Sequence, residues 1–217
     1  MQTLTARIRD AGLSNRVLSD EQLARLLEGT PQRRHSLVNR ALKSGELLRL
    51  RRGIYLLQQS LRTTAAHPFA LAQALLPGSY VSVETALAHH GWIPETVHVV
   101  ASVTPGRKTL EISHSELGNF SFHPLAIEAG FFLELIERVQ LQQQAMLVAR
   151  PFRALMDLVC QRKVEWQGID WLTSGLRIDY EQLRTINNAD IRKLELVYSH
   201  QRVRNFLKAL GKELGND

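Results

Sequence analysis

Apolar residues near the start of the chain recur with the spacing of short amphipathic helices. Leu4, Ile8 and Ala11 lie four and three residues apart and predict one helix that ends at Gly12. Ser19, followed by two acidic residues, has the form of a helix N-cap and predicts the start of a second helix. The second helix is expected to bury Leu23, Leu26 and Leu27.

A third helix and a hairpin follow directly. Thr30 and Pro31 form a strong helix start, and this helix is expected to run to about Lys43. Two short apolar runs come next, and between them Arg51-Arg52-Gly53 predicts a tight turn in which glycine permits a positive φ. Helices followed by a basic-tipped hairpin predict an N-terminal winged helix-turn-helix in residues 1–60.

The remaining chain mixes helical and strand patterns. Residues 58–66 are small and polar and predict a linker. The expected elements beyond it are helices at 67–76, at 82–90 and from 151, strands at 97–103, 109–113, 119–123, 131–141 and 145–148, and one or two further helices within 179–212. We therefore expect residues 65–217 to form a larger α+β domain with a small antiparallel sheet and a helical C-terminus.

Charge is distributed unevenly between these two regions. The whole chain of 217 residues has a net charge of +6. Residues 1–60 hold 11 Lys and Arg against 5 Asp and Glu, whereas residues 61–217 hold 16 of each. A basic excess confined to one small domain is typical of proteins that bind polyanions, so it favours double-stranded DNA as the partner of the first domain.

A helical wheel of the third predicted helix separates its apolar and polar sides. The apolar sector holds Leu37, Val38, Ala41 and Leu42. Arg34 points toward this sector, so we expect it at the rim of the core or on a carboxylate. The polar sector and the hairpin carry side chains that can contact base edges and phosphates, and the predicted DNA-binding residues are Gln32, Arg33, Ser36, Asn39, Arg40, Lys43, Arg49, Arg51 and Arg52.

Patterns of enzyme chemistry are weak. The segment 103–109 (Val-Thr-Pro-Gly-Arg-Lys-Thr) lacks the first glycine of a phosphate-binding loop, so a turn between strands is the better interpretation. The adjacent His89 and His90 would point about 100° apart on a helix, which does not fit a metal site. Asp157 lies in an apolar helix, where we expect a capping acid or a buried, hydrogen-bonded one. We predict no catalytic residue, no metal ligand and no cofactor.

Other features bear on where the protein acts. No run approaches the ~20 apolar residues of a membrane-spanning helix, and Arg7, Arg9 and Asp10 stand where a signal peptide would be apolar. The single cysteine, Cys160, is expected to be a buried small hydrophobe in a reducing compartment. These observations predict a cytoplasmic protein without a membrane partner.

Two segments resemble the AbiEi-type antitoxins, the transcriptional regulators of bacterial abortive-infection toxin–antitoxin pairs. The first is a Tyr-x-Ser-x-x-x-Ala-Leu-x-x-His-Gly run, formed here by Tyr80, Ser82, Ala86, Leu87, His90 and Gly91. The second is an Ala-x-Pro-x-x-Ala-Leu-x-Asp-Leu helix start, formed here by Ala149, Pro151, Ala154, Leu155, Asp157 and Leu158. Phe152 departs from the family pattern, which often has an acid after the proline.

The resemblance implies a specific pair of roles. The winged helix would bind inverted repeats in its own promoter and repress the operon, and the C-terminal domain would counter a cognate toxin of nucleotidyltransferase fold, directly or indirectly. The family supplies no catalytic residues. Two other interpretations remain open at this point: a DNA-acting enzyme, such as a nuclease or transferase with an unrecognised site in the C-terminal domain, or a protein-binding adaptor.

Overall fold

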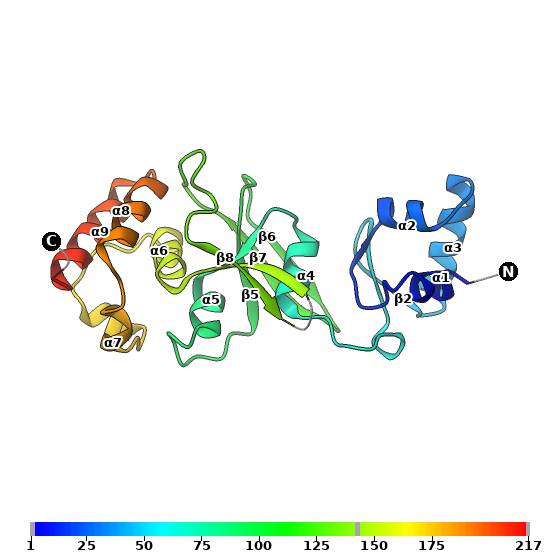
Figure 1. Cartoon of the computed structure of the whole chain (residues 1–217), viewed down its shortest axis with the longest axis horizontal. Coiled ribbons are helices and arrows are strands. Elements are labelled where there is room, and N and C mark those ends of the chain that lie inside the picture. Colours follow the sequence, from blue (N-terminus) through cyan, green and yellow to red (C-terminus); the bar gives the residue numbers. More distant parts are fainter. Residues whose placement is uncertain (1–2, 142–143, 216–217) are drawn as a thin grey trace. The chain divides into compact units, whose positions relative to one another are not determined.

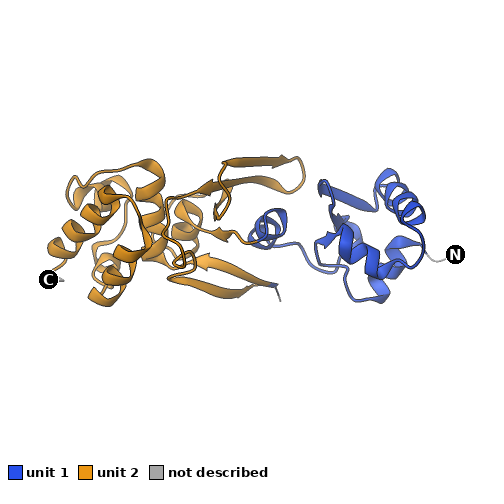
Figure 2. Cartoon of the chain, turned by 90° about the horizontal axis from the view of Figure 1, so that it is seen from above, with its two compact units in different colours: residues 1–77, 142–144 blue, residues 78–141, 145–217 orange. Residues whose placement is uncertain are grey.

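The computed structural model describes residues 3–141 and 144–215, and the parts of the predicted domains at 1–2, 142–143 and 216–217 lie outside the described residues. Helices and two β-sheets make up an α+β protein (Figure 1). The chain divides into two compact units (Figure 2): unit 1 is Met1–Pro77 with Gln142–Gln144, and unit 2 is Gly78–Leu141 with Ala145–Asp217. This division falls later in the chain than the predicted boundary at 60 to 65, because α4 groups with unit 1.

Unit 1 begins with the helices and hairpin expected from the sequence. Its elements are α1 (Leu4–Asp10), β1 (Leu18–Ser19), α2 (Asp20–Leu26), α3 (Pro31–Lys43), β2 (Leu47–Arg51), β3 (Ile54–Leu57), the 3-10 helix η1 (Gln59–Leu61) and α4 (Pro68–Leu75). Ser19 forms a capping box with Gln22, and the Thr30 hydroxyl accepts from the Arg33 amide, so both predicted N-caps are confirmed. Ala11 is a correction: it is the exposed C-cap of α1, which ends one residue earlier.

The sheet of unit 1 has the strand order β1-β3-β2, and both pairs are antiparallel. The strand β1 was not predicted, because two residues are too short to show an alternating pattern. It matters for the arrangement, since the pairing of Leu18 with Tyr55 places the start of α2 beside the hairpin. The buried core of this region consists of Leu4, Ile8, Leu18, Leu23, Leu27, Val38, Ala41, Leu47, Tyr55 and Leu57.

Unit 2 combines a six-stranded sheet with helices. Its elements are β4 (Tyr80–Val81), α5 (Val83–His89), β5 (Val99–Thr104), β6 (Leu110–His114), β7 (Gly118–Pro124), β8 (Ile136–Leu141), β9 (Gln144–Ala149), α6 (Pro151–Arg162), the π-helical turn η2 (Trp171–Gly175), α7 (Tyr180–Leu183), α8 (Asn188–Val197) and α9 (Gln201–Glu213). The C-terminal segment thus forms three helices where one or two were expected. Residues 131–135 form turns, with Leu135 at φ 54, so the predicted strand at 131–141 is shorter than expected.

The sheet of unit 2 is mixed, which corrects the prediction of an antiparallel sheet. The strand order is β6-β7-β5-β4-β9-β8. β5 pairs in parallel with β7, and β4 pairs in parallel with β9, whereas the β4–β5 and β6–β7 pairs are antiparallel. After β5 the chain passes to the outer edge as β6 and returns as β7 between them. Alternation of apolar residues reports which face is buried but not the direction of the neighbouring strand.

Several single-residue expectations in unit 2 are confirmed. Cys160 is buried at 6% exposure, and Trp92 is buried at 7%. Trp166 and Trp171 both pack edge-on against Phe206, with ring centroids 5.0 and 6.0 Å apart. Within the described ranges, no helix is long and apolar enough to cross a membrane.

Candidate nucleic-acid interface

Helix α3 presents the polar side that the helical wheel predicts. Val38 and Ala41 are buried on its inner side, and Leu37 and Leu42 are half-buried beside them. Asn39 is half-buried on the polar side. The predicted DNA-contacting side chains of α3 that are exposed are Gln32, Arg33, Ser36, Arg40 and Lys43. The helix is thus anchored through one face and offers the other to solvent.

Two side-chain interactions order the outer face of α3. The Ser36 hydroxyl donates to the Gln32 carbonyl over 3.0 Å, which leaves its oxygen lone pairs available as acceptors. The Asn39 amide nitrogen lies 3.1 Å from Nδ1 of His35. His35 was not among the predicted site residues, yet its ring holds Asn39 and is itself exposed.

The β2–β3 hairpin carries the second group of predicted residues. Arg49, Arg51 and Arg52 are all exposed, and the register shifts between Arg49 and Arg51. This bulge allows both arginines to be exposed while Leu50 between them stays buried at 6% exposure. Gly53 closes the turn with φ +77, a conformation that favours glycine.

A concavity lies between α2, α3 and the hairpin. It has a volume of about 650 Å³, and its polar lining includes Arg34, His35, Asn39, Arg49 and Arg52. A shallower hollow of about 380 Å³ is lined by Asn39, Leu42, Lys43 and Arg49. These hollows bring together four of the predicted residues: Asn39, Lys43, Arg49 and Arg52.

The other predicted residues lie outside that concavity. Arg40 lines a separate hollow on the α1 side, together with Thr3, Ser44 and Glu46. The remaining members of the predicted set, Gln32, Arg33, Ser36 and Arg51, are exposed but line none of these hollows. The basic surface of unit 1 therefore extends from the concavity around α3 toward α1.

Arg34 takes a position close to the predicted one. Its side chain is half-buried, and its Nη1 donates to the Gly29 carbonyl over 3.1 Å. It is thus at the rim of the core as expected, but it binds a backbone carbonyl where the alternative prediction named a carboxylate. It also lines the concavity beside Arg49 and Arg52.

An acid and a tyrosine at the base of the hairpin were missed by the sequence reasoning. Asp20 interacts with the hydroxyl of Tyr55, which also contacts Arg49. Burial and the nearby charge of Asp20 raise the pKa of Tyr55 above its usual value, so the phenol stays protonated. The signal for this cluster was not local, since it depends on the unpredicted pairing of β1 with β3.

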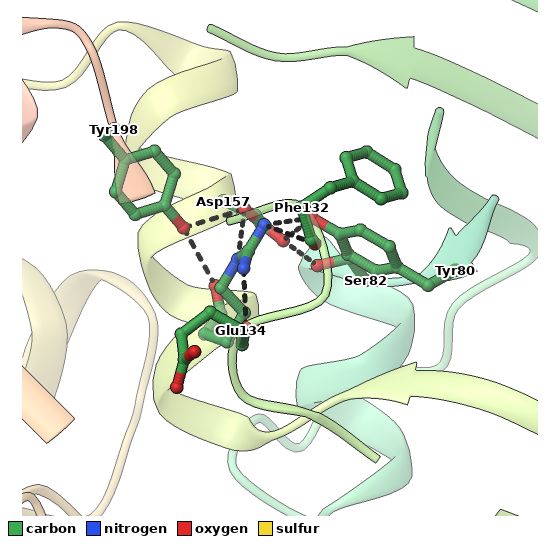
Figure 3. A network of polar contacts seen from close by, with 7 residues as sticks. Tyr80, Ser82, Phe132, Glu134, Asp157 and Tyr198 are labelled. Carbon is green, nitrogen blue, oxygen red and sulfur yellow. Dashed lines mark hydrogen bonds and ion pairs between the residues drawn. The ribbon is translucent and has the colours of Figure 1, made fainter. Parts of the chain in front are cut away.

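A second polar cluster lies inside unit 2 and involves both segments of the family resemblance (Figure 3). Arg153 and Asp157 on α6 are fully buried, and Nε of Arg153 lies 3.0 Å from Oδ1 of Asp157. The Asp157 carboxylate also accepts from Tyr80 over 3.0 Å, from Ser82 over 2.6 Å and from Tyr198 over 2.7 Å. The expectation of a buried, hydrogen-bonded acid at Asp157 is confirmed.

Arg153 is satisfied by the same cluster. Its Nη1 donates to the Glu134 carbonyl over 2.6 Å, and its Nη2 donates to the Tyr80 hydroxyl. Burial alone would lower the pKa of Arg153, but the charge of Asp157 outweighs burial and raises it. Burial and then the charge of Asp157 raise the pKa of Tyr80 and of Tyr198 well above the usual value. The cluster is therefore a neutral, closed network that serves the core.

This network also shapes the start of α5. Ser82 is the N-cap of α5, as predicted, but its side chain makes no capping hydrogen bond because its hydroxyl is donated to Asp157. The next residue, Val83, is buried and has φ 46, an unusual conformation for a β-branched residue. At the other end of α5, Nε2 of His90 donates to the Ala149 carbonyl over 2.9 Å. The two resembling segments thus contact each other directly.

No protein-family model and no curated protein matches this chain. Over residues 3–141 and 144–215, no group of three or more His, Cys, Asp or Glu residues is arranged to hold a metal ion. The functional argument therefore rests on the surface of unit 1 and on the residues that carry the resemblance.

Proposed function

We propose that unit 1 is a winged helix-turn-helix that binds double-stranded DNA, with α3 as the recognition helix and the β2–β3 hairpin as the wing. The observation that carries this proposal is the concavity between α3 and the hairpin, to which both elements contribute exposed basic and amide side chains. Winged and other helix-turn-helix proteins place the second helix of the motif in the major groove. The Thr30–Pro31 start of α3 leaves its first turn exposed for that approach.

The side chains of this surface match the chemistry of a duplex. Asn39 and Gln32 can each pair with adenine in two hydrogen bonds, and Arg40 with guanine. The arginines of the hairpin have the charge needed for phosphates or the minor groove. Asp20 lies behind Tyr55 at the root of the hairpin, where it orients Arg49 without covering the exposed guanidinium.

We further propose that the protein is a cytoplasmic autorepressor and antitoxin that counters a nucleotidyltransferase-fold toxin, not an enzyme. This part rests on the resemblance to AbiEi-type antitoxins. It is supported by the mutual packing of the two resembling segments, in which Tyr80 and Ser82 bind Asp157 and His90 binds the Ala149 carbonyl. Inverted repeats in the promoter would then be bound by two copies of unit 1.

Co-expression tests the antitoxin role. The neighbouring gene of the operon is expressed alone, with the full chain, and with the full chain carrying Arg40→Ala and Arg52→Ala. We expect that gene to arrest growth alone, and both forms of the protein to restore growth, because the substitutions lie in unit 1. A neighbouring gene that is harmless alone would contradict the antitoxin role.

Repression is measured separately with a reporter gene behind the same promoter. The full chain is expected to lower reporter expression, and the doubly substituted chain to lower it much less. Equal repression by both forms would contradict a role of the α3 and hairpin surface in the promoter complex.

A further inference from the structure

A large cavity in unit 2 lies apart from the DNA-facing surface and from the Arg153–Asp157 network. Its volume is about 790 Å³, within the usual range for sites that hold small molecules. We call it the β5–β7 cavity, because residues of these two strands form its floor. Its lining residues are Glu84, Ile93, Glu95, Thr96, Val97, His98, Val99, Ala101, Ser121, His123, Gln161, Arg162, Gly175 and Leu176.

Small side chains on neighbouring strands create this space. Ala101 of β5 lies in register with Ser121 of β7, and both line the cavity. Glu111 of β6 lies directly opposite Ser121, so its side chain shares the same face of the sheet. A larger residue at 101 or 121 would occupy the volume that these two positions leave open.

Ion pairs join the elements around the cavity. Glu84 on α5 pairs with Arg162 at the end of α6. Glu95, in the segment after α5, accepts from Nε of Arg177 over 3.0 Å. These contacts join three separate segments of unit 2, so the walls are held by side chains from distant parts of the chain.

The floor holds hydrogen-bonding groups that face the cavity. Ser121 is 8% exposed, and its hydroxyl has no hydrogen-bond partner among the described residues. Beside it, His123 is half-buried, and burial lowers the pKa of its ring, which favours the neutral form at pH 7. The charged groups that act on His123 are the carboxylates of Glu111 and Glu84. A buried hydroxyl without a partner is costly in free energy unless a ligand or water binds it.

We propose that the β5–β7 cavity binds a small organic cation, an alkylammonium or alkylguanidinium group on a short aliphatic chain. The cationic head would lie between Glu84 and Glu111 and donate to Ser121 and His123. The aliphatic chain would lie against Val97, Val99 and Leu176, and it would cover Val99, which is 38% exposed for an apolar side chain.

The charges around the floor favour a cation over an anion. The positive charge that lines the cavity belongs to Arg162, whose side chain is 49% exposed and already paired with Glu84. Exposed pairs of this kind contribute little, so a cationic ligand can share Glu84 at small cost. An anion would instead meet Glu84, Glu95 and Glu111 with little compensation. This site is independent of the proposed DNA-binding function.

Calorimetric titration of the full-length protein with agmatine tests the proposal, with pentanoate as an anion of similar length. We expect agmatine to bind one molecule per chain and pentanoate not to bind. Ser121→Ala should weaken agmatine binding about tenfold, the usual effect of losing a hydrogen bond to a charged group. Ser102→Ala is the matched control, because it removes a buried, unpartnered hydroxyl from the opposite face of β5 and should leave the affinity unchanged.

Two further variants make the test decisive. Ala101→Leu should abolish binding by filling the floor, and Glu84→Gln should weaken it about tenfold. Unchanged tryptophan fluorescence checks that each variant is folded. A capped arginine peptide distinguishes the source of the cation: if it binds as well as agmatine, the site also accepts a side chain of a protein partner. Absence of agmatine binding, equal binding of pentanoate, or full binding by Ser121→Ala would overturn the proposal.

Discussion

The carboxylate of Asp20 lies where a side chain at Gly53 would have to go. A Cβ on Gly53 would meet Oδ2 of Asp20 at 2.9 Å, and the Asp20 amide donates to the Gly53 carbonyl over 2.9 Å. The tip of the hairpin is therefore fastened to the first turn of α2, a segment more than thirty residues earlier in the chain. Because Arg49 and Arg52 flank this contact, it sets the position of the hairpin relative to α3.

Gly53→Ala tests this relationship, with Gly45→Ala as the matched control. Both glycines have positive φ, but a Cβ at Gly45 would meet nothing within 4 Å. We expect Gly45→Ala to lower the stability of unit 1 by about 1 to 2 kcal/mol from backbone strain alone. Gly53→Ala should cost more, because the contact with Asp20 adds to the same strain. Hydrogen exchange of the β2 and β3 amides measures both.

The double variant Gly53→Ala with Asp20→Ala separates the two contributions. Removal of the carboxylate should bring the cost of Gly53→Ala close to that of Gly45→Ala. If Gly53→Ala and Gly45→Ala are equally destabilising in the otherwise unchanged chain, the contact between Asp20 and the hairpin contributes nothing.

Arg34 and Arg33 are neighbours with different expected roles. Arg34→Ala removes the hydrogen bond to the Gly29 carbonyl and should destabilise unit 1 by about 1 kcal/mol. Arg33→Ala removes an exposed side chain and should change stability by less than about 0.5 kcal/mol while weakening DNA binding more. Hydrogen exchange and DNA titration on both variants check this. The reverse order of the two effects would contradict the assignment.

Arg153→Met should be among the most damaging substitutions in unit 2. It leaves the Asp157 carboxylate buried without its ion-pair partner, which costs about 3 to 5 kcal/mol. Arg162→Met, on the same helix, breaks a pair that is half exposed and should cost less than about 1 kcal/mol. Urea unfolding followed by tryptophan fluorescence reports on unit 2, because Trp92, Trp166 and Trp171 all lie there. Similar losses for both variants would show that the buried pair has no special role.

The stability of unit 2 should fall at alkaline pH. Tyr80 and Tyr198 have pKa values raised well above 10.0 by burial and by Asp157. Below pH 10 both states keep these protons, so stability is unaffected. Above pH 10 the unfolded state loses them first, and stability declines by up to about 1.4 kcal/mol per pH unit for each tyrosine.

Urea midpoints from pH 8 to 11 measure this decline. Tyr80→Phe should reduce the slope above pH 10, whereas Tyr180→Phe, which removes an exposed hydroxyl, is the control. An identical slope in the wild type and in Tyr80→Phe would contradict the buried environment of the phenol.

Local signals in the sequence predicted much of unit 1. Caps are contacts within four residues, so Ser19 and Thr30 identified the starts of α2 and α3. The glycine of the hairpin was equally local, since its conformation depends on its own φ. Strand direction in unit 2 was not predictable in this way, because the parallel pairing of β5 with β7 depends on where β6 inserts.

The candidate sites divide along the same line. The polar side of α3 follows from helical periodicity, and its predicted residues are exposed apart from the half-buried Asn39. The partners of Asp157 do not follow from periodicity, because Tyr80 and Tyr198 lie 77 and 41 residues away in the chain. Asp20 was known as an acid in the first turn of α2, but its contact with the hairpin requires β1, a strand of two residues.

The central claim is that the α3 and hairpin surface binds duplex DNA. The most direct test is fluorescence anisotropy of the full chain on a duplex from its own promoter, over a range of salt concentrations. Arg40→Ala with Arg52→Ala is compared with the wild type, and Arg184→Ala in unit 2 is the control. We predict much weaker binding by the double variant and a slope of log K against log salt that is smaller by about 1.8, from about 0.9 for each lost phosphate contact. Equal affinity and equal slope for the wild type and the double variant would contradict the account.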